Sequence, residues 1–290
     1  DVLYNASTLA DEPWLLTRDE EGIPMLALIF LVFGFIVMSI AAVFTLVLAV
    51  RYDGEIDQRP MGPIYYYIMF FVASISALVY YSMWSETSVV RIKEDGQTHI
   101  LFPARYLDWA ITSPLMLIAL SLLGDAPLPA IVGIVGCDML NVSCLFFGAF
   151  YGYEHKFFWW VTGLIFFAVL LFMLFQELSK ASELGRVSEY DANTLRWLTY
   201  IFAACWAVFP VVWLVGQTGT STTSFNVEMA FEVLADVVVK LSFILILIVR
   251  LPADGASQYS IKRDMNDIPD YGSATKSGGW RGNLTSSTFV

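Results

Sequence analysis

The chain has 290 residues, of which 57% are hydrophobic and 15% charged, and its mean hydropathy is +0.64. Soluble domains carry about 25% charged residues, so this composition excludes an ordinary soluble domain and indicates several membrane spans. A net charge of −11 argues against nucleic acid as a partner. The three cysteines lie in apolar runs and the two histidines in expected loops, which argues against a disulfide framework or a metal site.

Seven apolar runs are long enough to cross a bilayer, which takes about 20 residues. We expect these spans at 24–50, 63–86, 103–123, 128–151, 156–179, 193–216 and 227–250. The predicted fold class is an all-α membrane protein, a seven-transmembrane helix bundle formed by residues 24–250. Short linkers make consecutive helices antiparallel neighbours, and the longer 86–102 linker has room for a short hairpin. Residues 251–290 are polar and rich in Gly and Ser, which predicts a disordered tail.

Basic residues predict the orientation of the bundle, because cytoplasmic loops are enriched in Lys and Arg. Most of them fall in or beside the first and fifth linkers and after the last span: Arg51, Arg59, Lys180, Arg186, Arg196, Arg250, Lys262, Arg263, Lys276 and Arg281. The N-terminus, with the extracellular segment 1–23, is therefore expected outside and the C-terminal tail in the cytoplasm.

The third span contains the stretch ARYLDWAITSPLML, which places ionisable groups inside the membrane. Arg105 and Asp108 lie three residues apart on one helix face, and Thr112 lies one turn further along it. Trp109 adds a flat wall, and Pro114 frees a backbone carbonyl. An acid flanked by an arginine and a hydroxyl is suited to be the counterion of a buried cation.

The last span carries Glu228, Glu232, Asp236 and Lys240 at intervals of four residues, as a stripe on one helix face. One interpretation is a structural ion pair between Asp236 and Lys240. Such a pair rarely gains more free energy than its desolvation costs. A lysine in a dry pocket also forms Schiff bases with carbonyl compounds. We favour this second interpretation, because the third span supplies a further counterion.

These motifs together resemble those of the microbial (type 1) rhodopsins, in their bacteriorhodopsin-like branch, over roughly residues 24–250. The resemblance rests on Arg-Tyr-x-Asp-Trp-x-x-Thr-x-Pro in the third span and Asp-x-x-x-Lys in the seventh. Trp206…Pro210-Val-Val-Trp213, Trp159-Trp160 and Tyr80-Tyr-Ser-Met are also similar to family motifs. The family is one of integral membrane proteins rather than enzymes, here expected in the plasma membrane in contact with lipid and as a homo-oligomer.

The resemblance implies a role for each intramembrane group. Lys240 would carry all-trans retinal as a Schiff base, Asp108 would be counterion and proton acceptor, and Asp236 the second counterion. Arg105 would be the gate toward the outside, and Thr112 the helix hydroxyl beside the acceptor. The implied retinal pocket consists of Tyr80, Trp109, Ser113, Met116, Asp138, Asn141, Trp160, Gly163, Trp206, Phe209, Pro210 and Trp213.

One position departs from the family's outward proton pumps, which commonly carry a third carboxylate as cytoplasmic proton donor. Here that position is Ala119. We therefore expect an outward proton pump with slow reprotonation of the Schiff base. The alternatives are a sensory photoreceptor with a slow photocycle and a separate transducer, and, with less support, an inward proton pump or a light-gated channel.

The acids at the outer end of the last span leave two interpretations open. Glu228 matches one glutamate of the family's proton-release pair, and the partner position is Thr218. Glu232 could replace that partner and share a proton with Glu228, as a coupled pair. Alternatively, Glu232 forms an ion pair with Arg105.

Overall fold

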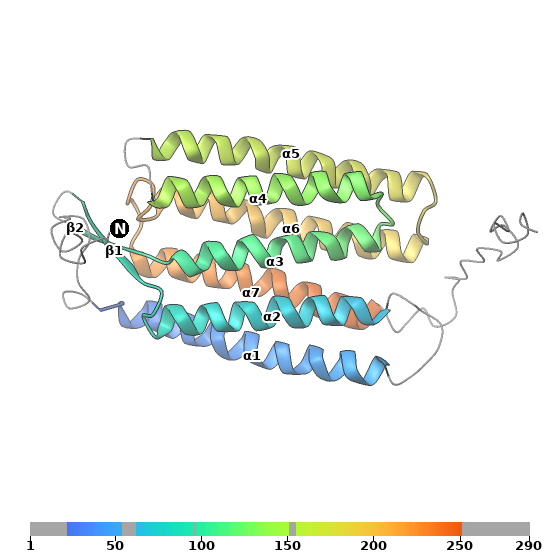
Figure 1. Ribbon diagram of the computed structural model, residues 1–290, viewed down its shortest axis with the longest axis horizontal. Coiled ribbons are helices and arrows are strands. Elements are labelled where there is room, and N and C mark those ends of the chain that lie inside the picture. Colours follow the sequence, from blue (N-terminus) through green and yellow to red (C-terminus); the bar gives the residue numbers. More distant parts are fainter. Residues whose placement is uncertain (1–21, 54–61, 95–96, 151–154, 251–290) are drawn as a thin grey trace, which may run out of the picture. The chain divides into compact units, whose positions relative to one another are not determined.

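A computed structural model describes residues 22–53, 62–94, 97–150 and 155–250. Most of the expected N-terminal segment and the whole expected tail therefore lie outside the described residues. The described residues form seven long helices and a short hairpin, arranged as Figure 1 shows. Their bounds are α1 Met25–Asp53, α2 Gly62–Trp84, β1 Val90–Glu94, β2 Gln97–Leu101, α3 Pro103–Leu123, α4 Leu128–Phe150, α5 Lys156–Glu183, α6 Glu189–Val215 and α7 Phe225–Arg250.

The helices pack as a closed ring. Each contacts the next in sequence, and α7 returns to contact α1. Contacts between α2 and α7, and between α3 and α6, cross the interior of the ring. Large apolar side chains such as Ile40, Phe158 and Phe172 are more than 60% exposed on the outside. Because that outer surface is hydrocarbon, it suits lipid rather than water, and polar groups are held inside.

Six of the described helices are long and apolar enough to cross a membrane, namely α1 to α6. The remaining helix, α7, has 26 residues but carries the stripe of four ionisable groups in its sequence. All four of these side chains are buried, with exposed fractions of 6% or less. The charges that lower the hydropathy of α7 therefore face the interior, and the predicted seven-helix bundle is confirmed. Which end faces the cytoplasm stays a prediction from the basic residues.

The helix bounds follow the predicted spans, with differences at polar ends. Helix α3 covers the predicted 103–123, and Pro103 occupies its first turn. Helix α6 begins four residues early, at Glu189, because the Ser188 hydroxyl caps it by accepting from the backbone N–H of Asp191. Helix α5 continues to Glu183. Hydropathy cannot predict such extensions, since they consist of polar residues beyond the apolar run.

The predicted hairpin is present between α2 and α3. Strands β1 and β2 pair antiparallel, with Val90 opposite Leu101. The backbone N–H of Ile100 donates to Gln217 Oε1 at 3.0 Å, which fastens the hairpin to the linker between α6 and α7. We call this end of the bundle the hairpin end and the other the opposite end.

Candidate functional site

The amine of Lys240 lies at the centre of the buried polar groups. Its side chain is fully buried, and its Nζ lies 2.5 Å from Asp108 Oδ2 and 2.6 Å from Asp236 Oδ1. Ser76 Oγ accepts a further hydrogen bond from Nζ at 2.7 Å. These partners come from α3, α7 and α2, so the ring of helices brings together groups far apart in the sequence. We call Lys240, Asp108 and Asp236 the inner cluster.

Each carboxylate of the inner cluster has a second partner on α2. Ser76 Oγ lies 2.8 Å from Asp108 Oδ1, and the Tyr80 hydroxyl donates to Asp236 Oδ2 at 2.8 Å. A Cβ at Gly34 of α1 would lie 2.9 Å from the Tyr80 ring, so only glycine leaves room for this phenol. The Thr112 hydroxyl donates to the backbone carbonyl of Asp108 at 2.8 Å and not to its carboxylate.

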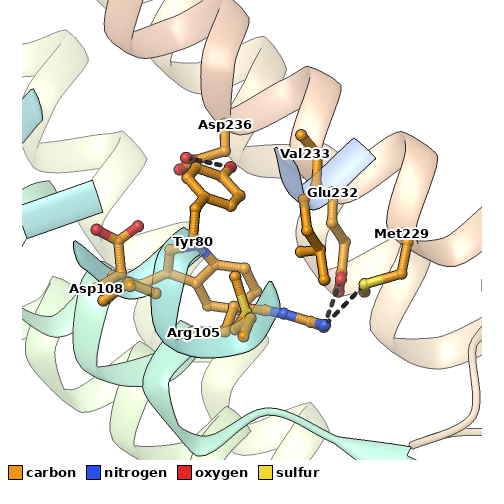
Figure 2. Close-up of a pocket in the computed structure, with 11 residues that line it drawn as sticks. Tyr80, Arg105, Asp108, Met229, Glu232, Val233 and Asp236 are labelled. Atoms are coloured by element: carbon orange, nitrogen blue, oxygen red, sulfur yellow. Dashed lines mark hydrogen bonds and ion pairs between the residues drawn. The ribbon is translucent and has the colours of Figure 1, made fainter. Parts of the chain in front are cut away.

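Figure 2 shows Arg105 reaching away from Asp108 and Asp236, toward Glu232 and Met229. Its guanidinium forms an ion pair with Glu232, and Nη1 lies 3.9 Å from Glu228 Oε1. Nη2 lies 3.5 Å from the Met229 sulfur. We call Arg105, Glu228 and Glu232 the outer cluster. Of the two interpretations of Glu232, the structure shows the ion pair with Arg105, while a proton shared with Glu228 stays a prediction.

The backbone around Glu228 holds its carboxylate in place. Gln217 N–H donates to Glu228 Oε2 at 2.8 Å. A Cβ at Gly216 would lie 2.7 Å from the same carboxylate, so a larger residue there would displace it. Thr218, which the family resemblance matches to the partner of Glu228, is buried and follows Gln217 in the chain.

A small cavity joins the inner and outer clusters (Figure 2). Its polar lining comes from Tyr80, Asp108, Asp236, Arg105 and Glu232. Trp109 and apolar side chains of α1, α2 and α7 form the rest of the wall. A continuous line of ionisable groups therefore runs from the buried amine toward the hairpin end.

The opposite half of the bundle holds mostly apolar side chains, with a few buried hydroxyls such as that of Ser121. Ala119 is 2% exposed and lies among buried residues of the main core, which include Leu120, Phe202, Phe243 and Leu247. The acid that lies furthest into α5 at this end is Glu177, whose carboxylate bonds Lys180 at 2.7 Å and Arg186 at 3.1 Å. Within the described helices, a buried carboxylate also lies on this side of the inner cluster, that of Asp138, which accepts from Ser113, five residues beyond Asp108 on α3.

Comparison with known proteins places this arrangement in a family. The family model described as bacteriorhodopsin-like protein matches residues 25–251. The chain belongs to this bacteriorhodopsin-like family of microbial rhodopsins. Bacteriorhodopsin of Halobacterium salinarum is 30% identical over 221 residues, covering 76% of this chain and 82% of that protein. Bacteriorhodopsin-I of Haloarcula marismortui is 30% identical over 205 residues, covering 67% of this chain and 79% of that protein.

Solved structures show the same fold. The light-driven proton pump Coccomyxa subellipsoidea rhodopsin superposes with a TM-score of 0.72 at 24% identity, covering 79% of this chain and 98% of that one. A cyanorhodopsin from the cyanobacterium Calothrix superposes with a TM-score of 0.71 at 24% identity, covering 79% and 96%. The chain is thus an integral membrane protein of a transporter family and not an enzyme, as expected from the sequence.

Membership in the rhodopsin family implies a retinal chromophore, and the residues around Lys240 fit this group. Trp109, Trp206 and Phe209 are buried together, with ring centroids 4.6 Å apart for Trp109 and Phe209 and 5.1 Å for Trp206 and Phe209. These rings, Asn141 and Pro210 line a second small cavity, and Trp109 also lines the cavity between the clusters. A buried amine beside an aromatic pocket is what attachment of a long apolar aldehyde requires.

The remaining predicted pocket residues surround these rings. Trp160 Nε1 donates to the carbonyl of Pro210 at 2.9 Å, and a Cβ at Gly163 would lie 3.3 Å from Asn141 Oδ1. Met116 and Trp213 are buried. Ser113 donates to Asp138, so these two form a polar pair between α3 and α4. Asn141 Oδ1 has no hydrogen-bond partner among the described residues.

Three contacts of the site were not anticipated. They involve Ser76, Gln217 and Met229. The sequence did contain a pattern that could have predicted the contact of Ser76. Ser76 lies four residues before Tyr80 and therefore on the same face of α2. Gln217 acts through its backbone N–H, which carries no sequence signal.

Proposed function

We propose that this protein is a light-driven outward proton pump in which the proton returns to Lys240 slowly. The observation that carries the proposal is the asymmetry around Lys240. Its amine contacts two carboxylates at 2.5 and 2.6 Å, and a cavity lined by further ionisable groups continues from them toward the hairpin end. With the hairpin end outside, as the basic residues predict, a proton that leaves Lys240 has a line of acceptors on the outward side.

All-trans retinal, held by Lys240 as a Schiff base, would supply the light-driven change that starts transport. The protein contributes charges that receive the proton. Asp108 and Asp236 lie at nearly equal distances from Nζ, so distance alone does not choose between them. The family resemblance supports Asp108 as acceptor. Asp236 would then remain the charged counterion, which the hydrogen bond from Tyr80 stabilises.

The outer cluster would release a proton to the medium. It contains one cation and two carboxylates, so that a single additional proton makes it neutral. When Asp108 becomes neutral, Arg105 is attracted less strongly toward the inner cluster and more toward Glu232 and Glu228. This shift favours loss of a proton held between the two glutamates, whose titration belongs to the pair.

Return of a proton to Lys240 from the cytoplasm would be slow. A positioned proton donor accelerates such a step by about 10²–10⁴-fold. Ala119 occupies the position where the family's pumps commonly carry that donor, and its surroundings are hydrocarbon. The proton must therefore arrive with water that crosses the apolar half of the bundle.

The test is the light-induced pH change of weakly buffered cells that express the protein with retinal. Outward pumping predicts acidification that a protonophore abolishes and that Lys240→Ala cells lack. Alkalinisation sensitive to the protonophore would reverse the proposed direction. Coloured cells without any pH change would contradict transport.

The apolar opposite half also supports a second candidate, a sensory photoreceptor. Slow return of the proton would prolong the light-activated state, which suits signalling to a separate transducer. The same cells decide between the two, since a sensor would be coloured and have a slow photocycle but move no net proton.

We further propose that the protein lies in the plasma membrane as a homo-oligomer. The exposed apolar side chains of α1, α4 and α5 provide surface for lipid or for a second copy. Cross-linking in native membranes, followed by electrophoresis, distinguishes oligomers from monomers.

A further inference from the structure

Ser76 is a fully buried hydroxyl at the inner cluster that the proposed pump does not use. Its Oγ lies 2.7 Å from Lys240 Nζ, 2.8 Å from Asp108 Oδ1 and 2.9 Å from the backbone carbonyl of Val72. Among the described side chains, it alone forms hydrogen bonds with both the amine and the carboxylate of Asp108. This position makes Ser76 a direct neighbour of the reacting groups.

The direction of these hydrogen bonds follows from the chemistry of the partners. A protonated amine only donates, so Ser76 accepts from Lys240. The single hydroxyl proton of Ser76 can then go to Asp108 or to the Val72 carbonyl. A charged acceptor forms the stronger bond, so the ionised carboxylate of Asp108 receives it. Once Asp108 takes up a proton, the Val72 carbonyl becomes the better acceptor.

We propose that Ser76 is a positioning residue that keeps Asp108 ionised in the dark and aims its free oxygen at Lys240. The hydroxyl holds Oδ1, which leaves Oδ2 directed at Nζ at 2.5 Å. The inference rests on the proposed role of Asp108 as proton acceptor. It adds a residue that determines how readily that acceptor binds a proton before light arrives.

Other groups also act on Asp108. Lys240 and Asp236 face it from α7, Tyr80 from α2, and Arg105 and Glu232 lie at the outer end of the same cavity. All of these are titratable or charged, whereas Ser76 is neutral. Replacing Ser76 therefore removes one hydrogen bond without changing the charge of the cluster.

The experiment is a pH titration of the visible absorption of the purified, retinal-bound protein in the dark. Neutralising Asp108 weakens the attraction on the cationic Lys240 linkage and shifts the colour to the red, so the midpoint reports proton binding at Asp108. Ser76→Ala should raise this midpoint by about one to two pH units, a ten- to hundredfold change in proton affinity, as expected for a lost hydrogen bond to a charged group.

Two variants control for packing and for the nature of the substitution. Ser76→Thr keeps the hydroxyl and should titrate within about 0.3 pH units of the unmodified protein, a twofold change in affinity. Ser121→Ala is the matched control, because Ser121 is also a buried serine, 4% exposed, and its hydroxyl has no hydrogen-bond partner among the described residues. It should leave the midpoint unchanged.

The double variant Ser76→Ala/Asp108→Asn identifies the titrating group, and its colour should no longer change over this pH range. The proposal is overturned if Ser76→Ala titrates like the unmodified protein, if Ser121→Ala shifts it equally, or if the double variant still titrates. Because the measurement is made in the dark, it is independent of pumping. A protein that moves no proton but shows the Ser76→Ala shift would contradict transport and leave this inference standing.

Discussion

The two halves of the bundle on either side of Lys240 differ sharply in chemistry. Toward the hairpin end, the inner cluster, a polar-lined cavity and the outer cluster follow one another. Toward the opposite end, Ala119 lies in the apolar core, and apart from Asp138, which pairs with Ser113, the described acids lie near the helix ends. The difference teaches that a ring of similar helices can favour one direction of proton movement through the uneven placement of its charged groups alone.

Helix α7 displays the same contrast within one element. From Glu228 to Lys240 it carries an ionisable residue at every fourth position, whereas residues 241–249 are apolar apart from Ser242. In the proposed pump, a proton on the first part would move between fixed charges over short distances. On the second part it would meet no ionisable side chain before the helix end, so water would have to carry it.

The largest expected effect follows from removing the group at the boundary between the halves. Lys240→Ala should abolish visible absorption completely, because no other described lysine is buried beside an aromatic pocket. Absorption spectra after addition of retinal measure this, with Lys180→Ala as a control at a 39% exposed lysine side chain. Circular dichroism should show that helix content is retained. Colour in Lys240→Ala would disprove the attachment site.

Adding a carboxylate to the opposite half should reduce the chemical difference between the two halves of the bundle. Ala119→Asp places a proton donor in the opposite half, and we expect recovery of the dark state to accelerate about 100-fold, within the range for a positioned acid. Flash spectroscopy measures the recovery time. Ala119→Asn has nearly the same shape without the acid and should recover slowly. Equal recovery in both variants would show that proton return does not limit the cycle.

Neutralising one carboxylate of the inner cluster should separate the roles of the two acids. Asp108→Asn should shift the absorption maximum to the red and stop the light-driven transfer of the proton from Lys240. Asp236→Asn should also change the colour but retain the transfer. Time-resolved absorption of both variants compares them. Continued transfer in Asp108→Asn would mean that Asp236 is the acceptor.

The smallest effect is expected at the outer cluster. Glu232→Gln replaces a charged partner of Arg105 by a neutral one, and a charge-assisted hydrogen bond is worth roughly 1 kcal/mol more than a neutral one. We therefore expect release of the proton to the medium to slow by about five- to tenfold. A pH-indicator dye measures the release time. Glu228→Gln is the matched variant, and an unchanged release time in both would exclude this cluster from proton release.

The sequence predicted the helices and the inner cluster well, because both depend on local spacing. Asp236 and Lys240 lie one helical turn apart, and the third-span motif resembles a family signature, so their meeting required only a closed bundle. The hairpin between α2 and α3 was expected from linker length alone. Helix ends such as Glu189 were missed, since a polar cap leaves no trace in hydropathy.

The contacts that the sequence did not predict come from packing between distant elements. Ser76 and Asp108 lie on different helices, and a serine on an apolar helix does not show which neighbour it faces. The contact of Arg105 with Glu232 was one of two alternatives, because both Glu228 and Glu232 lie on the same face of α7. Only the relative depth of α3 and α7 decides between them.

The hydrogen bonds of Gln217 have a practical consequence for protein engineering. Its side chain holds the hairpin through Ile100, and its backbone holds the carboxylate of Glu228. A fluorescent reporter or affinity tag inserted into the hairpin would pull on this residue and disturb the outer cluster. If the hairpin end faces outside, as the basic residues predict, a binder raised against the hairpin would act on the outer cluster through the same connection without entering the bundle.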